Sequence, residues 1–263
     1  MARDPKSITQ ASETALDRLA SRTPARIFVG RSGAGYRTST ELELRGAQAA
    51  AADAVRSEFN LIGDLGDHAV RRFQIFEVGT EAHSKVEYLA NPSLGRRLGA
   101  DAKEEILRRC PAGVDLQIAV GDGLSVAAVS AQVPRLLPLV IAAAKHRGWS
   151  VGQVFAVHYC RVGILNDIGE LLHPRIAVLL IGERPGLATA ESLSAYMAYQ
   201  PRAGHTDADR NLISNIHSRG VPVEQAAERI VELAAKLMSA KLSGATVKED
   251  LPMQRGLSRD TTK

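Results

Sequence analysis

From residue 115 onwards, short apolar runs alternate with helix-like stretches, a pattern that few folds accommodate. The runs are DLQIAV at 115–120, VGQVFAVHY at 151–159 and RIAVLLIG at 175–182. Strand–helix–strand units of this kind build parallel sheets that are covered by helices on both faces. The sequence therefore predicts an α/β fold, with a Rossmann-like, mostly parallel sheet and flanking helices.

The rest of the chain suggests three parts. Residues 1–24 are polar around a short amphipathic piece and predict an N-terminal helical arm, residues 25–245 form the α/β domain, and residues 246–263 read as a polar C-terminal tail. Apolar residues at three- and four-residue steps predict a helix that packs on the sheet. They are Leu44, Ala47, Ala51, Val55 and Phe59.

The sequence also makes a prediction for each of four further segments. The stretch from 126 to 148 predicts two helical pieces, the second beginning at Pro134 and ending at Gly148. AESLSAYMAYQPR at 190–202 fits either a helix or a strand. HTDADRNLISNIH at 205–217 predicts a turn followed by helical or irregular chain, with Asp209 or Asn211 as a helix cap. Pro222 is expected to open a final helix.

Composition limits the cellular setting and the partners. Two cysteines in 263 residues make no disulfide framework and suit a reducing cytosol. No apolar run approaches the roughly 18 residues of a membrane span, and the first residues carry no secretory h-region. The net charge of +4 comes from scattered arginines with no aromatic platform among them. We therefore expect a cytoplasmic protein that binds neither membrane nor nucleic acid.

The stretch ARIFVGRSGAGYRTSTELEL at 25–44 has the outline of a phosphate loop. A β-branched run at 26–29 meets Gly30, Gly33 and Gly35, and Thr38 and Glu41 then stand at capping-box spacing. Strand, glycine turn and helix together present backbone N–H groups to an anion.

Known nucleotide motifs do not fit this loop. A Walker A loop needs Lys and then Ser or Thr after its last glycine, whereas Tyr36 and Arg37 follow here. The glycine spacing is G-x-x-G-x-G rather than the Rossmann G-x-G-x-x-G. A tight turn beneath a packed helix is the favoured interpretation, and nucleotide binding stays as the alternative.

The sequence contains no complete motif for catalysis or for metal binding. GDGLS at 121–125 is not a nucleophile elbow, and Asp122 or Ser125 could cap a helix, with or without a ligand contact. The seven histidines include no pair four residues apart, and Cys110 and Cys160 lie far apart in sequence. Both cysteines are expected to be structural, although Arg161 beside Cys160 could lower its pKa.

Charged residues follow two of the predicted strands. In GERPGL, Glu183 and Arg184 directly follow the most strand-like run. In HYCRV, Arg161 and Val162 follow the predicted strand that precedes it in the chain. If these strands are neighbours, Arg161 and Glu183 lie near one ligand at the edge where α/β folds bind.

A string of motifs in fixed order resembles the small (light) subunit of ethanolamine ammonia-lyase over residues 25–245. The motifs are GRSGAG, RTST, NPSLGRRL, GDGLS, GERPGL, ESLSAY and ADRNLISNIH. The resemblance implies an adenosylcobalamin-dependent lyase that converts ethanolamine to acetaldehyde and ammonia. It also implies a large subunit that carries the substrate and the radical chemistry, with this chain as a required partner in a hetero-oligomer.

The resemblance also implies which residues meet the cofactor. Val162, Glu183 and Leu212 are the first expected cobalamin contacts, with Arg161 next, at an amide oxygen or the phosphate. The sequence lacks the D-x-H-x-x-G motif that places a histidine under cobalt, so the resemblance implies cobalamin with its own benzimidazole base on the metal.

Two departures from the family pattern affect these expectations. Leu212 stands where the family often has cysteine, so a contact there uses backbone or apolar surface, and Gly121 stands where serine is common. The N-terminal arm is short for the family, and longer arms are associated with bacterial microcompartments, so we expect a location either in the open cytoplasm or inside such a compartment.

Two other functions remain as alternatives. The first is a stand-alone nucleotide- or phosphate-binding α/β protein that uses the 30–37 loop. The second is a purely structural assembly protein whose loops touch only another subunit.

Overall fold

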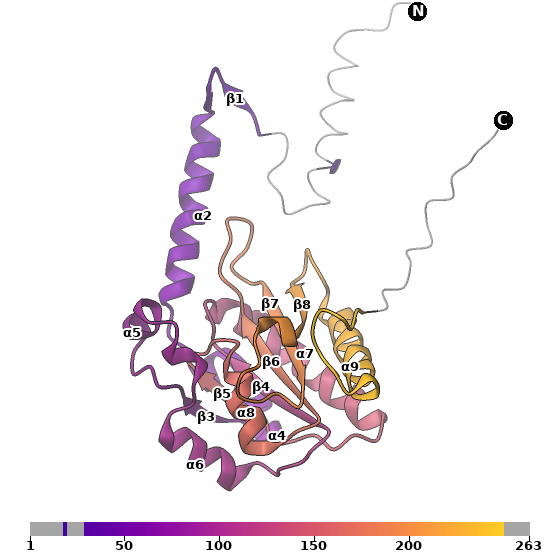
Figure 1. Ribbon diagram of the computed structural model, residues 1–263. Helices are drawn as coiled ribbons and strands as arrows, with labels where there is room; N and C mark the ends of the chain where they lie inside the picture. The colour runs from indigo at the N-terminus through magenta and orange to yellow at the C-terminus, as the bar shows by residue number, and fades with distance from the viewer. Residues whose placement is uncertain (1–17, 20–28, 250–263) are drawn as a thin grey trace, which may run out of the picture.

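The computed structural model describes residues 18–19 and 29–249, and its centre is a six-stranded sheet in the order β3-β5-β4-β6-β7-β8 (Figure 1). The strands are β3 (Phe76–Gly79), β4 (Leu116–Gly121), β5 (Phe155–His158), β6 (Ile176–Gly182), β7 (Leu193–Tyr199) and β8 (Asn211–Ile216). The first four in chain order are parallel, and β7 runs antiparallel to both β6 and β8. The predicted α/β fold with a mostly parallel sheet is confirmed. The strand order differs from the 3-2-1-4-5-6 order of dinucleotide-binding folds, so a Rossmann-like order is not confirmed.

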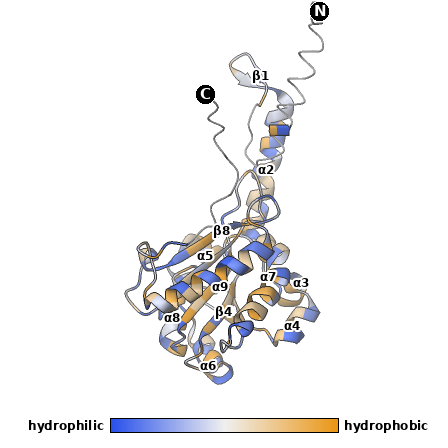
Figure 2. Cartoon of the chain, turned by 90° about the vertical axis from the view of Figure 1, so that its right-hand side faces the viewer, coloured by the Kyte–Doolittle hydropathy of each residue, from blue (hydrophilic) through white to orange (hydrophobic). Residues whose placement is uncertain are grey.

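Helices cover the sheet on both faces. One face packs against α7 (Val126–His146) and α9 (Val223–Ala240), and the other against α6 (Ala100–Arg109) and α8 (Ile164–Leu172). Because side chains alternate along a strand, Ile118 and Val120 enter the first core, whereas Ala119 enters the second. Figure 2 shows apolar strands behind α9, whose outer face carries a hydrophilic stripe.

Short elements complete the domain around this sheet. Helices α3 (Leu61–Leu65) and α4 (Asp67–Phe73) precede β3. Helix α5 (Lys85–Ala90) and the 3₁₀ turn η1 (Leu94–Arg96) follow it, and a second 3₁₀ turn, η2 (Asp207–Asp209), leads into β8. Three of these short elements, α5, η1 and η2, supply residues of the site described below.

Helix α7 is one continuous helix, so the expected division into two pieces is wrong. Pro134 and Pro138 lie inside it, although each proline removes a backbone hydrogen bond. One side of α7 is packed against the sheet and α9. The apolar surface buried there stabilises the continuous helix by more than the two lost hydrogen bonds destabilise it. Ser125 caps its first turn, accepting a hydrogen bond from the Ala128 N–H at 3.2 Å, as one of the two candidate caps was expected to do.

Among the described helices, α7 alone is long and apolar enough to cross a membrane, judged by length and composition. Half of its most apolar stretch is buried inside the domain. Leu136, Leu137 and Val140 are fully buried in the core that α7 shares with β4 and β6, so these apolar residues serve the packing of the domain.

The glycine loop and the helix after it stand apart from the sheet. Strands β1 (Arg31–Ser32) and β2 (Gly35–Tyr36) form an exposed hairpin, and α2 (Thr38–Arg56) projects from the domain below it (Figure 1). The expected tight turn is confirmed, with Gly33 at φ +63°. The expected capping box is wrong, since Arg37 is the N-cap and makes no side-chain cap.

The expected packing of α2 on the sheet is also wrong. Only Thr40 and Ala54 of this helix are buried, and its contact within the domain is with α7 rather than with the sheet. The helical spacing of its small apolar side chains correctly predicts a helix. That spacing does not determine which part of the protein the helix packs against. Residues 26–28 of the run at 26–29 and most of the expected N-terminal arm lie outside the described residues.

The two segments that the sequence left ambiguous or misassigned are both strands. The chain from 193 to 199 forms β7, and the chain from 211 to 216 forms β8 rather than a helix. Asp209 closes a capping box with Thr206 at η2 instead of capping a longer helix. Pro222 is the N-cap of α9, one residue before its first turn.

The first residues of the expected tail pack on the domain. Val247 is buried, and Glu249 forms an ion pair with Arg229 of α9. The remainder of that tail lies outside the described residues, and the three-part division of the chain stays a prediction.

Candidate functional site

Three loops start from one edge of the sheet, at the carboxyl ends of β4, β5 and β6. In the register of these parallel strands, Gly121 lies beside Val157 on one side and Ile181 on the other. The segments that follow are those singled out in the sequence: 121–125, 159–163 and 183–192. Ligands of open α/β sheets bind at this edge, so the polar residues on these loops form the candidate site.

The loop after β5, which carries Arg161 and Val162, is held by hydrogen bonds to its backbone. The Thr80 hydroxyl donates to the carbonyl oxygens of His158 and Tyr159, both at 3.2 Å. The Arg161 N–H donates to the Gly95 carbonyl at 2.7 Å. Tyr159 adopts a left-handed backbone conformation with φ +56°, which is uncommon for a residue of this size. The loop therefore has one defined shape before any ligand arrives.

A buried ion pair lies beneath the same loop. The Lys85 ammonium is 3.3 Å from one carboxylate oxygen of Asp122, and both side chains are almost fully buried. The other Asp122 oxygen accepts the Cys160 N–H at 2.9 Å, and the Tyr88 hydroxyl donates to the Cys160 carbonyl at 2.9 Å. Asp122 is thus no helix cap. It links the loop after β4 to the loop after β5.

Both cysteines are structural, as expected. Burial raises the pKa of the Cys110 thiol to about 12. Burial, reinforced by the nearby Asp122 carboxylate, raises the pKa of the Cys160 thiol well above its ordinary value. The lowering influence of Arg161 on Cys160 is smaller than these two effects, so neither thiol is activated at neutral pH.

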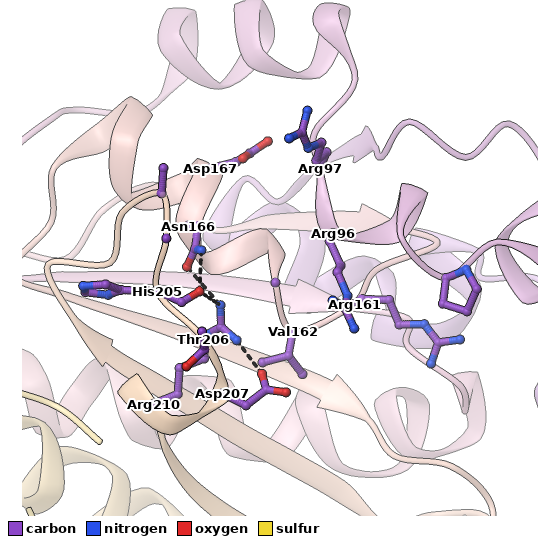
Figure 3. Close-up of a pocket in the computed structure, with 14 residues that line it drawn as sticks. Arg96, Arg97, Arg161, Val162, Asn166, Asp167, His205, Thr206, Asp207 and Arg210 are labelled. Carbon is purple, nitrogen blue, oxygen red and sulfur yellow. Dashed lines mark hydrogen bonds and ion pairs between the residues drawn. The ribbon is translucent and has the colours of Figure 1, made fainter. Parts of the chain in front are cut away.

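Arg161 and Val162 line a cavity of about 540 Å³ between η1, the start of α8 and the 203–210 segment. Figure 3 shows Arg96 and Arg161 on one side of it and Arg210 with Asp207 on the other, with Val162 between them. The Arg161 guanidinium lies over the Tyr88 ring, with its central carbon 4.5 Å from the ring centre. The stacking holds the cation beside the cavity.

Glu183 and Leu212 meet at Tyr196 of β7. Burial, and then the charge of the nearby Glu183 carboxylate, raise the pKa of Tyr196 to about 12. Leu212 lies opposite Tyr196 in the antiparallel β7–β8 pair, so the two side chains share one face of the sheet. The Leu212 side chain is 43% exposed and offers an apolar contact to a partner.

The four expected residues therefore occupy one face in two adjoining groups. Val162 and Tyr196 both pack against the core under α8. The charges of Asp207 and Arg210, which line the cavity, also act on Tyr196. Tyr196 and Arg210 thus connect the Arg161–Val162 group to the Glu183–Leu212 group.

Comparison with known proteins agrees with this arrangement of motifs. Residues 13–248 match the family described as ethanolamine ammonia-lyase light chain (EutC). The chain belongs to the ethanolamine ammonia-lyase small-subunit family. It is 41% identical to the Clostridium perfringens ethanolamine ammonia-lyase small subunit over 227 residues, which is 86% of this chain and 75% of that protein. It is 36% identical to the Clostridium acetobutylicum small subunit over 241 residues, 92% of this chain and 97% of that one.

Membership of this small-subunit family makes the chain a subunit of a lyase. Among the described residues, no group of three or more His, Cys, Asp or Glu side chains is placed to hold a metal ion. The site instead offers arginines, the carboxylates of Asp167, Asp207 and Glu183, the Tyr196 phenol and apolar side chains.

Sequence reasoning missed two residues of this ethanolamine ammonia-lyase small-subunit site. Tyr196 lies in the segment left open between helix and strand, and Arg210 in a segment expected to form a turn and then a helix. The available signal for a strand was the short, mostly apolar run LSAYMAY with its two tyrosines, since aromatic residues are enriched in strands. Nothing in the sequence pairs Arg210 with the cavity, because that contact spans more than forty residues.

The environment of His217, in the ISNIH motif, predicts that the free energy of unfolding falls in acid. It is buried, and its Nδ1 accepts the Arg219 N–H at 3.2 Å. Burial, and then the Arg219 charge, lower its pKa. The unfolded chain therefore binds the proton more readily, and the free energy of unfolding should fall as pH drops below about 6.5. His205, whose pKa burial also lowers, acts in the same direction.

Denaturant titrations between pH 7.5 and 5 measure this effect. His217→Gln should flatten the decline, whereas His68→Gln, at an exposed position, should leave it unchanged. An unaltered decline in His217→Gln would show that the acid sensitivity arises elsewhere.

Proposed function

We propose that this chain holds adenosylcobalamin at its contact with the large subunit of ethanolamine ammonia-lyase, which converts ethanolamine to acetaldehyde and ammonia. The observation that carries the proposal is the shared face on which Arg161, Val162, Glu183 and Leu212 lie, around Tyr196 and a cavity of about 540 Å³. When bound, the cofactor supplies the radical chemistry, and the protein supplies position and electrostatics.

The residues present fit the chemistry of cobalamin. Its amide side chains need hydrogen-bond acceptors and donors, its phosphodiester needs a cation, and its ring edges need apolar contact. Glu183 is half-buried at the end of β6 and can accept from amide N–H groups. The Arg161 Nε–H is buried and has no partner among the described residues, so it has a donor available for an anionic or amide oxygen.

Each of these residues has a defined task in binding. The fixed loop after β5 keeps Arg161 and Val162 in place without a change of shape, which lowers the entropic cost of binding. Val162 and Leu212 provide apolar surface that excludes water. Tyr196 lies close enough to the Glu183 carboxylate for its charge to act on the phenol, and it connects Glu183 to the Val162 side of the face.

Acetaldehyde release from ethanolamine tests the function itself. The assay, with adenosylcobalamin present, compares this chain alone, the large subunit alone and the two together. We expect activity in the mixture only, because this chain offers binding residues and the partner supplies the catalytic ones. Equal activity of the large subunit alone would contradict a required role.

A single substitution tests the cofactor contact. Glu183→Ala should raise the Kd for adenosylcobalamin in the assembled complex about tenfold, the usual value of one lost hydrogen bond to a charged group. The free energy of unfolding should change by no more than about 1 kcal/mol, because Glu183 is half-buried at a strand end. Equilibrium dialysis gives the first quantity and denaturant titration the second.

Glu191→Ala is the matched control, since it removes an exposed carboxylate from the same loop and should leave the Kd unchanged. A Glu183→Ala complex that binds the cofactor as tightly as the wild type would remove Glu183 from the site.

A further inference from the structure

Tyr159 has a strained backbone conformation at the start of the loop after β5. Its φ of +56° is uncommon for a residue other than glycine, and such a conformation persists only where surrounding contacts hold it. Arg161 and Val162, two of the proposed cofactor contacts, follow two and three residues later. The contacts that hold Tyr159 therefore decide the shape in which these two residues are presented.

The aromatic ring of Tyr159 is held from the buried side of the loop. The Lys85 ammonium is 5.7 Å from the centre of this ring and 5.5 Å from the centre of the Tyr88 ring. The two ring centres are 6.1 Å apart. A cation at such a distance from an aromatic ring is attracted by it. Because these contacts fix the ring, they also fix the position of its hydroxyl.

That hydroxyl binds a residue that lies 101 positions away in the sequence. The Tyr159 hydroxyl donates to the Glu58 carboxylate at 3.2 Å. Burial, and then the charge of Glu58 and this hydrogen bond, raise the pKa of Tyr159. The phenol is therefore protonated at neutral pH and serves as the donor.

The next residue, Phe59, makes a second contact with the end of β5. Phe59 is buried, and its ring meets the His158 ring edge-on, with the ring centres 5.4 Å apart. The His158 Nε2 is in turn 3.1 Å from the Glu77 carboxylate of β3. Residues 58 and 59 therefore contact residues 158 and 159, and two adjacent contacts fix the direction of the segment as well as its distance.

Glu58 and Phe59 lie at the foot of α2, the helix that projects from the domain (Figure 1). A helix of 19 residues is about 28 Å long, and only Thr40 and Ala54 of α2 are buried. A tilt of so long and so lightly packed a helix moves the chain at its foot. The Glu58–Tyr159 hydrogen bond therefore links the placement of α2 to the loop after β5.

We propose that Tyr159 and Glu58 are positioning residues for the cofactor. Their hydrogen bond holds the loop after β5 in the shape that presents Arg161 and Val162, and it ties that shape to the placement of α2. Tyr159 acts through the loop backbone and Glu58 acts through Tyr159, so neither residue needs to touch the cofactor. This assignment rests on the proposed cofactor role.

The affinity of the assembled complex for adenosylcobalamin, measured by equilibrium dialysis, tests the proposal. Tyr159→Phe keeps the ring and removes the hydroxyl, and Glu58→Ala removes its acceptor. Each should raise the Kd about three- to tenfold, the usual effect of one hydrogen bond. The double variant should raise the Kd no further, because both changes remove the same bond. Glu58→Gln keeps an acceptor oxygen and should restore an affinity close to that of the wild type.

Further variants separate positioning from backbone strain and from folding. Tyr159→Gly accepts the left-handed conformation without strain but lacks the ring, so it should raise the Kd at least as much as Tyr159→Phe. Glu228→Ala removes an exposed carboxylate from α9, on the opposite face of the sheet, and should leave the Kd unchanged. Thermal unfolding of each variant shows that folded samples are being compared.

Several outcomes would overturn the proposal. A wild-type Kd in folded complexes of Tyr159→Phe and Glu58→Ala would reduce the pair to a structural contact, and weakened binding in Glu183→Ala would then leave the cofactor role standing. A wild-type Kd in Tyr159→Gly would show that the ring does not hold the loop. Effects that add in the double variant would show that the two residues act separately. A wild-type complex that retains no adenosylcobalamin would overturn both this assignment and the cofactor role.

Discussion

Replacing Lys85 with methionine is expected to lower the free energy of unfolding by about 3–5 kcal/mol. The substitution leaves the Asp122 carboxylate buried, with the Cys160 N–H as its remaining hydrogen-bond partner. An uncompensated buried charge is far more costly than a lost surface ion pair. Denaturant titration of the full chain at pH 7 measures the change.

The same substitution should also weaken cofactor binding, because Asp122 holds the loop that carries Arg161 and Val162. In Lys85→Met, any movement of Asp122 toward solvent pulls on the Cys160 backbone. We expect the Kd for adenosylcobalamin to rise in the assembled complex even where the variant is fully folded, and conditions of high stability, at low temperature, allow that measurement.

Two controls frame the Lys85 result. Lys103→Met breaks a partly exposed ion pair with Asp167 and should cost about 1 kcal/mol or less. Lys85→Met combined with Asp122→Asn keeps an acceptor for the Cys160 N–H and removes the buried charge, so it should be more stable than Lys85→Met alone. A loss in Lys85→Met no larger than that in Lys103→Met would contradict the account of the ion pair.

Gly182→Ala is expected to destabilise the domain by about 3 kcal/mol. A Cβ atom at Gly182 would stand 2.0 Å from the Ser125 carbonyl oxygen and 2.8 Å from that of Asp122. Both contacts are with backbone, which cannot swing away as a side chain can. The end of β6 would separate from the loop after β4, and Glu183 would move with it.

Gly186→Ala, four residues further along the same GERPGL motif, is the matched control. No atom lies within 4 Å of a Cβ built at Gly186, so the free energy of unfolding should change by about 0.5 kcal/mol or less. Thermal or denaturant unfolding compares the pair. Equal losses at the two glycines would show that the close approach of the loops at Gly182 does not matter.

The parts of the fold that the sequence predicted are those fixed by local pattern. The runs at 115–120 and 175–182 became β4 and β6, since continuous apolar runs of that length suit strands buried on both faces. The final helix expected after Pro222 is α9, and Ile230, Leu233 and Leu237 on its apolar face are buried. Ser125 capped α7 for an equally local reason.

The parts that failed depend on contacts between distant segments. Pro134 and Pro138 locally favour a break in the helix. The packing of α7 between the sheet and α9 keeps it continuous. The chain at 211–216 forms a strand because its backbone pairs with the edge of β7. The stripe on α2 gave the right helix but the wrong placement.

The candidate site likewise contains residues that local sequence patterns predicted and residues that only contacts between distant segments bring together. Arg161, Val162 and Glu183 follow strand ends, so topology alone predicted their neighbourhood. The Lys85–Asp122 pair and the Arg210 contacts join residues 37 and 44 positions apart, and no local pattern encodes such pairings. Tyr196, which joins the two halves of the site, became visible only with the register of β7 and β8.

The most direct test of the central claim is the amount of adenosylcobalamin that each sample retains at equilibrium. The samples are this chain alone, the large subunit alone and the assembled complex, and the absorbance of the cofactor reports the bound fraction. If this chain holds the cofactor at the contact between subunits, the complex will bind it much more tightly than either component. An affinity of the large subunit alone equal to that of the complex would contradict the claim.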